Sequence, residues 1–88
     1  PTEYLLYQNY PNPFNPVTNI KYSIITETDV TIKIYDILGN ELKTLVDEFQ
    51  RPGFYNIKLD GSNFSSGVYF YRIIANNFIS TKKLILLK

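Results

Sequence analysis

Apolar and polar residues alternate along most of this chain, with the repeat of two that is typical of β-strands. The clearest case is residues 30–35, where every second residue is Val or Ile. The same period occurs in residues 18–24 and 54–59, so each segment is expected to bury one face. The residues predicted to point inward are Ile20, Tyr22, Ile24, Val30, Ile32, Ile34, Tyr55, Ile57 and Leu59.

The end of the chain predicts a hairpin. Residues 68–75 and 78–87 are rich in aromatic and aliphatic side chains, and Asn76 and Asn77 lie between them. Asn tolerates the left-handed backbone conformation that a tight hairpin turn requires. The inward face of the last strand is ambiguous, because its final residues are apolar on both sides.

Tyr69 begins the first strand of this hairpin, directly after a corner that contains Gly67. The placement resembles a tyrosine corner, in which the Tyr hydroxyl binds a backbone group a few residues upstream. Tyr69 then points inward, and the parity of the strand gives the other faces: Tyr71 and Ile73 inward, and Val68, Phe70 and Arg72 outward.

Residues 41–49 admit two interpretations. Four apolar residues occur there at helical spacing, which favours an amphipathic helix. We predict a strand over residues 41–46, because the preceding turn leaves only the short connection of a hairpin. The helix remains the alternative.

Proline marks the start of the chain. Pro11, Pro13 and Pro16 lie close together, and proline cannot donate to a regular strand ladder. We therefore expect a first strand within residues 1–10, a rigid elbow over 11–16, and the rest of a sandwich over 17–88.

About seven short strands separated by turns predict an all-β fold, an immunoglobulin-like antiparallel β-sandwich. The length of 88 residues allows one domain, and eight Tyr and six Phe supply the apolar area that a small core needs. The chain begins with Pro rather than Met, so we interpret it as a piece of a larger protein.

Composition excludes most catalytic sites. The chain has no His and no Cys, which removes Ser-His-Asp and Cys-His arrangements, and its carboxylates lie in turns or at the ends. Acidic and amide residues in turns do not form a clustered calcium loop. We therefore expect no enzyme activity, no cofactor and no metal. A net charge of +1 and scattered basic residues argue against nucleic acid, and no apolar run is long enough for a membrane-spanning helix.

One outer face is a candidate binding surface. In an immunoglobulin-like sheet order, the third, sixth and seventh strands are neighbours. Lys33, Tyr35, Phe70, Arg72 and Lys83 would then share an outer face, and this basic, aromatic patch suits a protein or polyanion partner.

The stretch from Gln8 to Thr18, with its Asn-Tyr-Pro-Asn-Pro-Phe-Asn-Pro core, resembles the opening signature of type A C-terminal sorting domains of the type IX secretion system. The resemblance continues to the basic and then aliphatic ending at residues 82–88. Leu59 departs from the pattern, because relatives commonly carry Trp there. The residues that match the family pattern are Pro11, Asn12, Pro13, Phe14, Asn15, Pro16, Gly39, Gly53, Gly67 and Tyr69.

The resemblance implies an immunoglobulin-like domain, related to that of the flagellar hook-capping protein, at the end of diverse secreted proteins. It implies a non-catalytic domain that directs an N-terminal cargo through the periplasm and across the outer membrane to the cell surface or medium. The implied partners are the type IX translocon, an outer-membrane shuttle protein and a sortase. We expect the domain to be monomeric.

The last strand is the candidate recognition signal within this resemblance, through Lys82, Lys83, Leu84, Ile85 and Leu86. Its long edge is expected to be open to pairing with a partner strand. The alternative is a carbohydrate-binding or adhesion module on an extracellular enzyme, which would present an exposed row of aromatic side chains.

Overall fold

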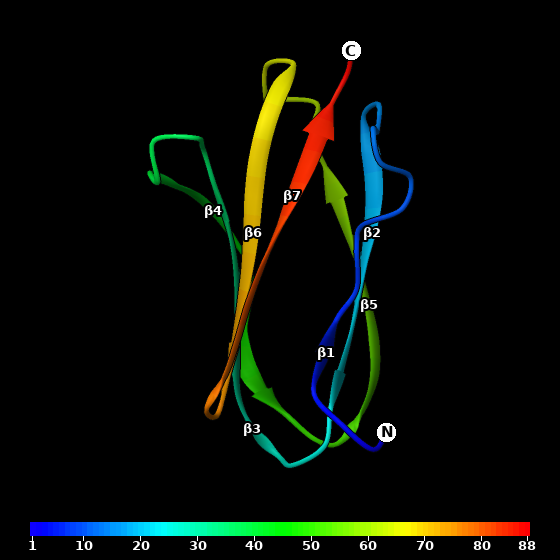
Figure 1. Cartoon of the computed structure of the whole chain (residues 1–88), viewed down its shortest axis with the longest axis vertical. Coiled ribbons are helices and arrows are strands. Elements are labelled where there is room, and N and C mark those ends of the chain that lie inside the picture. Colours follow the sequence, from blue (N-terminus) through cyan, green and yellow to red (C-terminus); the bar gives the residue numbers. More distant parts are fainter.

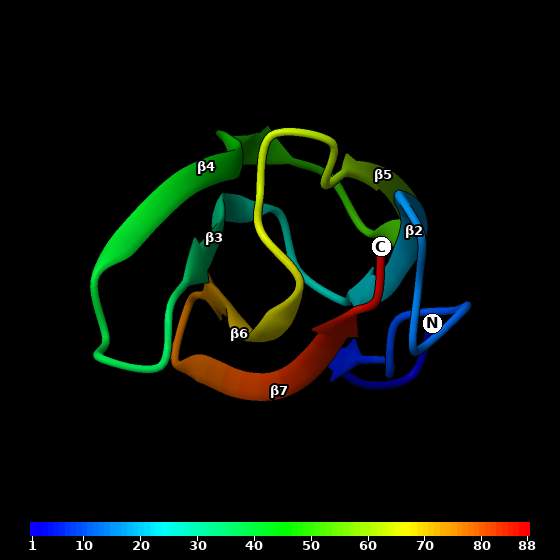
Figure 2. The ribbon, with the colours of Figure 1, turned by 90° about the horizontal axis from the view of Figure 1, so that it is seen from above.

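The computed structural model describes residues 1–88 and contains two antiparallel sheets packed face to face (Figure 1). The sheet orders are β1-β2-β5 and β4-β3-β6-β7, and Figure 2 shows the two layers from above. This confirms the predicted all-β sandwich. The strands are β1 (Leu5–Leu6), β2 (Val17–Ile24), β3 (Thr28–Tyr35), β4 (Glu41–Gln50), β5 (Gly53–Asp60), β6 (Gly67–Ala75) and β7 (Phe78–Leu86).

The core lies between the sheets and follows the predicted parity. The inward residues of β2, β3 and β6 are all buried, as is Leu59 of β5. Tyr55 and Ile57 also point inward but are only half-buried, since β5 is at the edge of its sheet. The Tyr55 ring stacks on Tyr22 with the ring centroids 5.2 Å apart.

The tyrosine corner and the Asn turn are confirmed. The Tyr69 hydroxyl donates a hydrogen bond to the carbonyl oxygen of Ser65 at 2.6 Å. Asn76 has a φ of 57°, the left-handed conformation expected at the tight turn between β6 and β7.

Residues 41–50 form a strand, which confirms the strand interpretation and extends it past residue 46. The pairing of β4 with β3 shifts twice, so that Leu42 and Leu45 have no partner residue on β3. Each is the extra residue of a β-bulge, and a bulge interrupts the alternation of faces. The two bulges account for the helical spacing of Leu42 and Leu45, whereas Phe49 pairs regularly with Asp29 and is an exposed residue of the strand.

The first strand is shorter than the predicted residues 1–10, because only Leu5 and Leu6 pair regularly with β2. The chain beyond them is held by the buried hydroxyl of Tyr71. This hydroxyl donates to the carbonyl oxygen of Tyr7 at 2.7 Å and accepts from the backbone N–H of Asn9 at 2.8 Å. Burial raises the pKa of Tyr71 to about 12.

The two ends of the chain lie at opposite ends of the long axis of the sandwich (Figure 1). The Cα atoms extend 37 Å along that axis and 23 and 16 Å across it. The structure contains no helix that is long and apolar enough to cross a membrane.

Candidate functional site

The outer face of β3, β6 and β7 carries the predicted patch. The strand register sets Lys33 beside Arg72, Tyr35 beside Phe70, and Phe70 beside Lys83. All five residues therefore lie on one face of the four-stranded sheet, directed away from the core. None of them is buried, so each is available to a partner.

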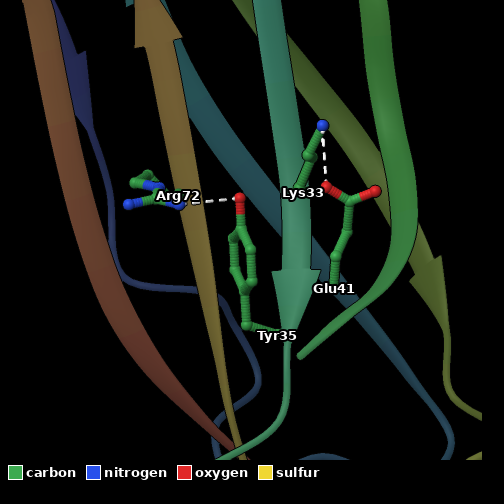
Figure 3. Close-up of polar contacts among 4 residues, drawn as sticks. All are labelled: Lys33, Tyr35, Glu41 and Arg72. Atoms are coloured by element: carbon green, nitrogen blue, oxygen red, sulfur yellow. Dashed lines mark hydrogen bonds and ion pairs between the residues drawn. The ribbon is translucent and has the colours of Figure 1, made fainter. Parts of the chain in front are cut away.

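Arg72 is the central cation of this face. Its Nη2 donates a hydrogen bond to the Tyr35 hydroxyl at 2.9 Å, and its guanidinium lies 4.7 Å from the centroid of the Tyr35 ring (Figure 3). Its Nε is buried without a hydrogen-bond partner. The side chain is held in place by a neutral neighbour, so its charge is not compensated by a carboxylate.

Lys33 differs from Arg72 because it is already paired. Its ammonium group lies 2.7 Å from a carboxylate oxygen of Glu41, in the one salt bridge of the structure (Figure 3). The hydrogen bond with Glu41 raises the pKa of Lys33. A partner with negative charge therefore meets more free positive charge at Arg72 and Lys83 than at Lys33.

A depression of about 370 Å³ adjoins Arg72, between the sheet and the turn that joins β3 to β4. Asp36 begins that turn and accepts hydrogen bonds from the backbone N–H groups of Leu38 and Asn40, both at 2.9 Å. These bonds, with one from the Asn40 side chain, lower the pKa of Asp36. The Asp36 carboxylate therefore already accepts hydrogen bonds from groups of its own turn. The lining residues are Tyr35, Asp36, Ile37, Gly39, Phe70, Arg72 and Thr81.

Thr81, Ile37 and Gly39 were not identified from the sequence as part of this site. Thr81 lies beside Arg72 in the register of β6 and β7. The alternation of inward and outward residues in β7 would have placed Thr81 on this face, but the alternation is obscured because the end of the strand is apolar on both sides. Ile37 is 70% exposed on the turn, and Gly39 adopts a φ of 84° that lets the turn close.

The predicted signal in the last strand is split between two faces. Leu84 and Leu86 are fully buried in the core. Lys83 and Ile85 have the opposite parity and lie on the outer face, while Lys82 is half-buried on the inner side. In the folded domain a partner can reach Lys83 and Ile85, but it cannot reach the two buried leucines.

The edge of β7 is not open along its final residues, which corrects the expected pairing with a partner strand. The elbow already covers it. The backbone N–H of Phe14 donates to the carbonyl oxygen of Ile85 at 2.9 Å, and that of Leu87 donates to the carbonyl oxygen of Phe14 at 3.0 Å. Asn12 adds a further bond, as its side-chain oxygen accepts from the N–H of Ile85 at 2.9 Å.

Side-chain packing reinforces this contact between the elbow and the last strand. Phe14 is 2% exposed, and a Cβ atom built on Gly61 would lie 3.1 Å from Phe14 and 3.2 Å from Leu86. A side chain at residue 61 would therefore force its neighbours to shift by a few tenths of an ångström, and Gly61 lets the three segments approach closely. The other elbow residues are exposed and shape the backbone: Pro11, Pro13, Asn15 and Pro16.

The remaining family-pattern residues sit at turns and strand starts. Gly53 opens β5 and Gly67 opens β6. Tyr69 is the buried residue of the tyrosine corner. These positions fix the backbone and do not present side chains to a partner.

The chain was compared with known proteins and protein families. It matches the family described as the secretion system C-terminal sorting domain over residues 8–87, a range that includes the elbow, the turn beside Arg72 and nearly all of β7. No curated protein gives a significant match. This chain belongs to the family of C-terminal sorting domains of the type IX secretion system.

Proposed function

We propose that this domain is a non-catalytic signal that directs an attached cargo protein from the periplasm across the outer membrane. Its partners are then the type IX translocon, an outer-membrane shuttle protein and a sortase. The observation that carries this proposal is the family match over residues 8–87. That range contains both the elbow and the strand that the elbow covers, so the matched sequence corresponds to one folded unit.

The outer face around Arg72 is the surface that we propose for recognition. It combines an uncompensated guanidinium with Lys83 and with apolar side chains such as Phe70 and Ile79, and β6 and β7 carry no carboxylate at all. This composition is complementary to a partner surface with carboxylates and apolar groups. The residues of β7 before Lys83 add backbone groups that the elbow does not cover.

Truncation of the last strand is a poor test of this surface, because it removes Leu84 and Leu86 from the core. Charge reversal is a sharper test. A fluorescent reporter with a signal peptide would be fused ahead of residue 1, in a bacterium with the type IX machinery and in a strain without the translocon. The variant carries Arg72→Glu and Lys83→Glu. The matched control carries Lys43→Glu and Lys58→Glu, two exposed lysines away from the face.

We expect the unmodified fusion and the control variant to reach the surface or medium in the competent strain only. The variant with Arg72 and Lys83 reversed should remain in the periplasm, with circular dichroism and thermal unfolding verifying that it folds. Equal export of both variants would eliminate the outer face as the recognition surface. Retention of the unmodified fusion in both strains would eliminate the sorting function itself.

A further inference from the structure

The outer face of the other sheet carries an exposed row of aromatic rings. Tyr10 is 80% exposed, Phe54 is 72% exposed and Tyr7 is 42% exposed. The backbone of Tyr10 bonds Asn19 of β2, that of Tyr7 bonds Lys21 of β2, and Phe54 of β5 lies beside residue 23 of β2. The row therefore runs along β2, from the level of residue 19 to that of residue 23, about 13 Å at the usual rise of a strand.

A groove made of two adjoining depressions follows this row. Two depressions of about 440 and 400 Å³ lie next to each other and share three lining residues, Tyr7, Lys21 and Asn56. Asn56 is the register partner of Lys21, so the shared residues cross the sheet at one level. The further lining residues are Tyr22, Phe54 and Tyr55 on one side and Gln8, Tyr10 and Asn19 on the other.

The fold uses the side-chain polar groups of Gln8, Tyr22 and Tyr55 but leaves those of the other polar lining residues unbonded. Tyr10 contributes two backbone hydrogen bonds with Asn19, both at 3.0 Å, but its ring lies in solvent. No intramolecular hydrogen bond involves the Tyr10 hydroxyl or the side-chain polar groups of Asn19, Lys21 and Asn56. Exposed aromatic rings cost solubility without stabilising the core, and a contiguous exposed patch of them marks a binding surface.

The composition of the groove selects the class of ligand. Flat rings alternate with free amide groups that both donate and accept hydrogen bonds, so the ligand needs apolar faces and hydroxyl groups at its rim. Lys21 is the only charged lining residue, whereas a nucleic acid strand would require several cations. A peptide would bind a strand edge or a deep apolar pocket, and this groove lies on the face of a sheet.

We propose that this groove binds a neutral oligosaccharide. Tyr10, Tyr7 and Phe54 stack on the sugar rings, and the side chains of Asn19, Lys21 and Asn56 bond the hydroxyl groups. The site lies on the opposite sheet from Arg72, so it does not depend on the proposed sorting function. The length of the row suits a chain of several sugar rings rather than one.

The test is affinity electrophoresis of the domain in native gels that contain hydroxyethylcellulose, laminarin, xylan or galactomannan. Oligosaccharides from any retarding polysaccharide are then titrated calorimetrically. Tyr10→Ala and Phe54→Ala are each expected to weaken binding about five- to tenfold, the loss of one stacked ring. Phe49→Ala is the matched control, because Phe49 is 59% exposed on β4, outside the groove.

Unchanged affinity of Phe49→Ala, together with weaker binding by the two groove variants, would support the proposal. Absence of retardation by all four polysaccharides would overturn it, as would an equal loss in all three variants. Binding of an extended peptide library at the groove, without any glycan, would reassign the site to peptides. Export of a reporter fused to the Phe54→Ala variant should be unchanged, which separates failure of this site from failure of the sorting function.

Discussion

Replacement of Phe14 by alanine tests whether the elbow is part of the core. Phe14 is 2% exposed, and its ring packs beside Gly61 in contact with the end of β7. Truncation of a buried Phe to Ala costs about 3–5 kcal/mol, through lost burial and the cavity that remains. A domain of this length is stabilised by roughly 4–13 kcal/mol in total. We therefore expect Phe14→Ala to remove a large part of the free energy of unfolding.

Urea unfolding followed by circular dichroism measures this loss, and thermal unfolding should shift downward by on the order of 15–30 °C. Leu38→Ala is the control, because Leu38 is 82% exposed and its truncation should cost less than about 0.5 kcal/mol. Amide hydrogen exchange adds a local readout, since the N–H of Leu87 bonds the carbonyl oxygen of Phe14. A loss below about 1 kcal/mol, or unchanged exchange at Leu87, would refute the role of the elbow in the core.

Two further substitutions test individual contacts. Gly61→Ala places a Cβ atom 3.1 Å from Phe14 and 3.2 Å from Leu86. Because this overpacks the contact, we expect the free energy of unfolding measured in urea to fall by about 1–3 kcal/mol. A variant as stable as the unmodified domain would contradict the tight approach. Tyr71→Phe leaves the buried N–H of Asn9 without its acceptor and should cost about 1–3 kcal/mol. The folded-state pKa of Tyr71 is raised to about 12 from 10.0. The folded state therefore favours the neutral hydroxyl of Tyr71, and this stabilisation is fully present below pH 10. As the pH rises from 10 to 12, the free energy of unfolding should fall by about 2–3 kcal/mol. Unfolding measured across that range should show a steeper decline in the unmodified domain than in Tyr71→Phe, and parallel curves would contradict the shift.

The alternation of residues was sufficient to predict β2, β3 and β5 and most of the core. Each of β2, β3 and β6 has one continuous inward face, and the corner at Tyr69 fixes the parity of β6. The bounds of β4 were less accessible, because Leu42 and Leu45 are bulge residues that break the alternation. A local pattern cannot distinguish a bulged strand from a short amphipathic helix.

The closed edge of β7 could not be predicted, because it depends on contacts between residues far apart in the sequence. Phe14 stands between prolines and has no neighbouring pattern that would mark it as a core residue. Leu84 and Leu86 were included in a candidate signal because the basic and then aliphatic ending matches the family pattern, and the inward face could not be read from a strand that is apolar on both sides. Only the pairing of Tyr69 with Leu84 shows which side is the core. The aromatic groove was missed for a similar reason, since Tyr7 and Tyr10 lie in an irregular segment without readable parity.

The placement of the two ends of the chain has a mechanical consequence. A protein joined ahead of Pro1 would be attached at the end of the sandwich opposite Lys88. The domain extends 37 Å along the axis that separates these two ends. The turn between β3 and β4, which borders the depression at Arg72, lies toward the Lys88 end (Figure 1). The folded sandwich therefore separates the attachment point of such a protein from the Lys88 end, and a partner that binds near Lys88 would contact the domain at its far end from that protein.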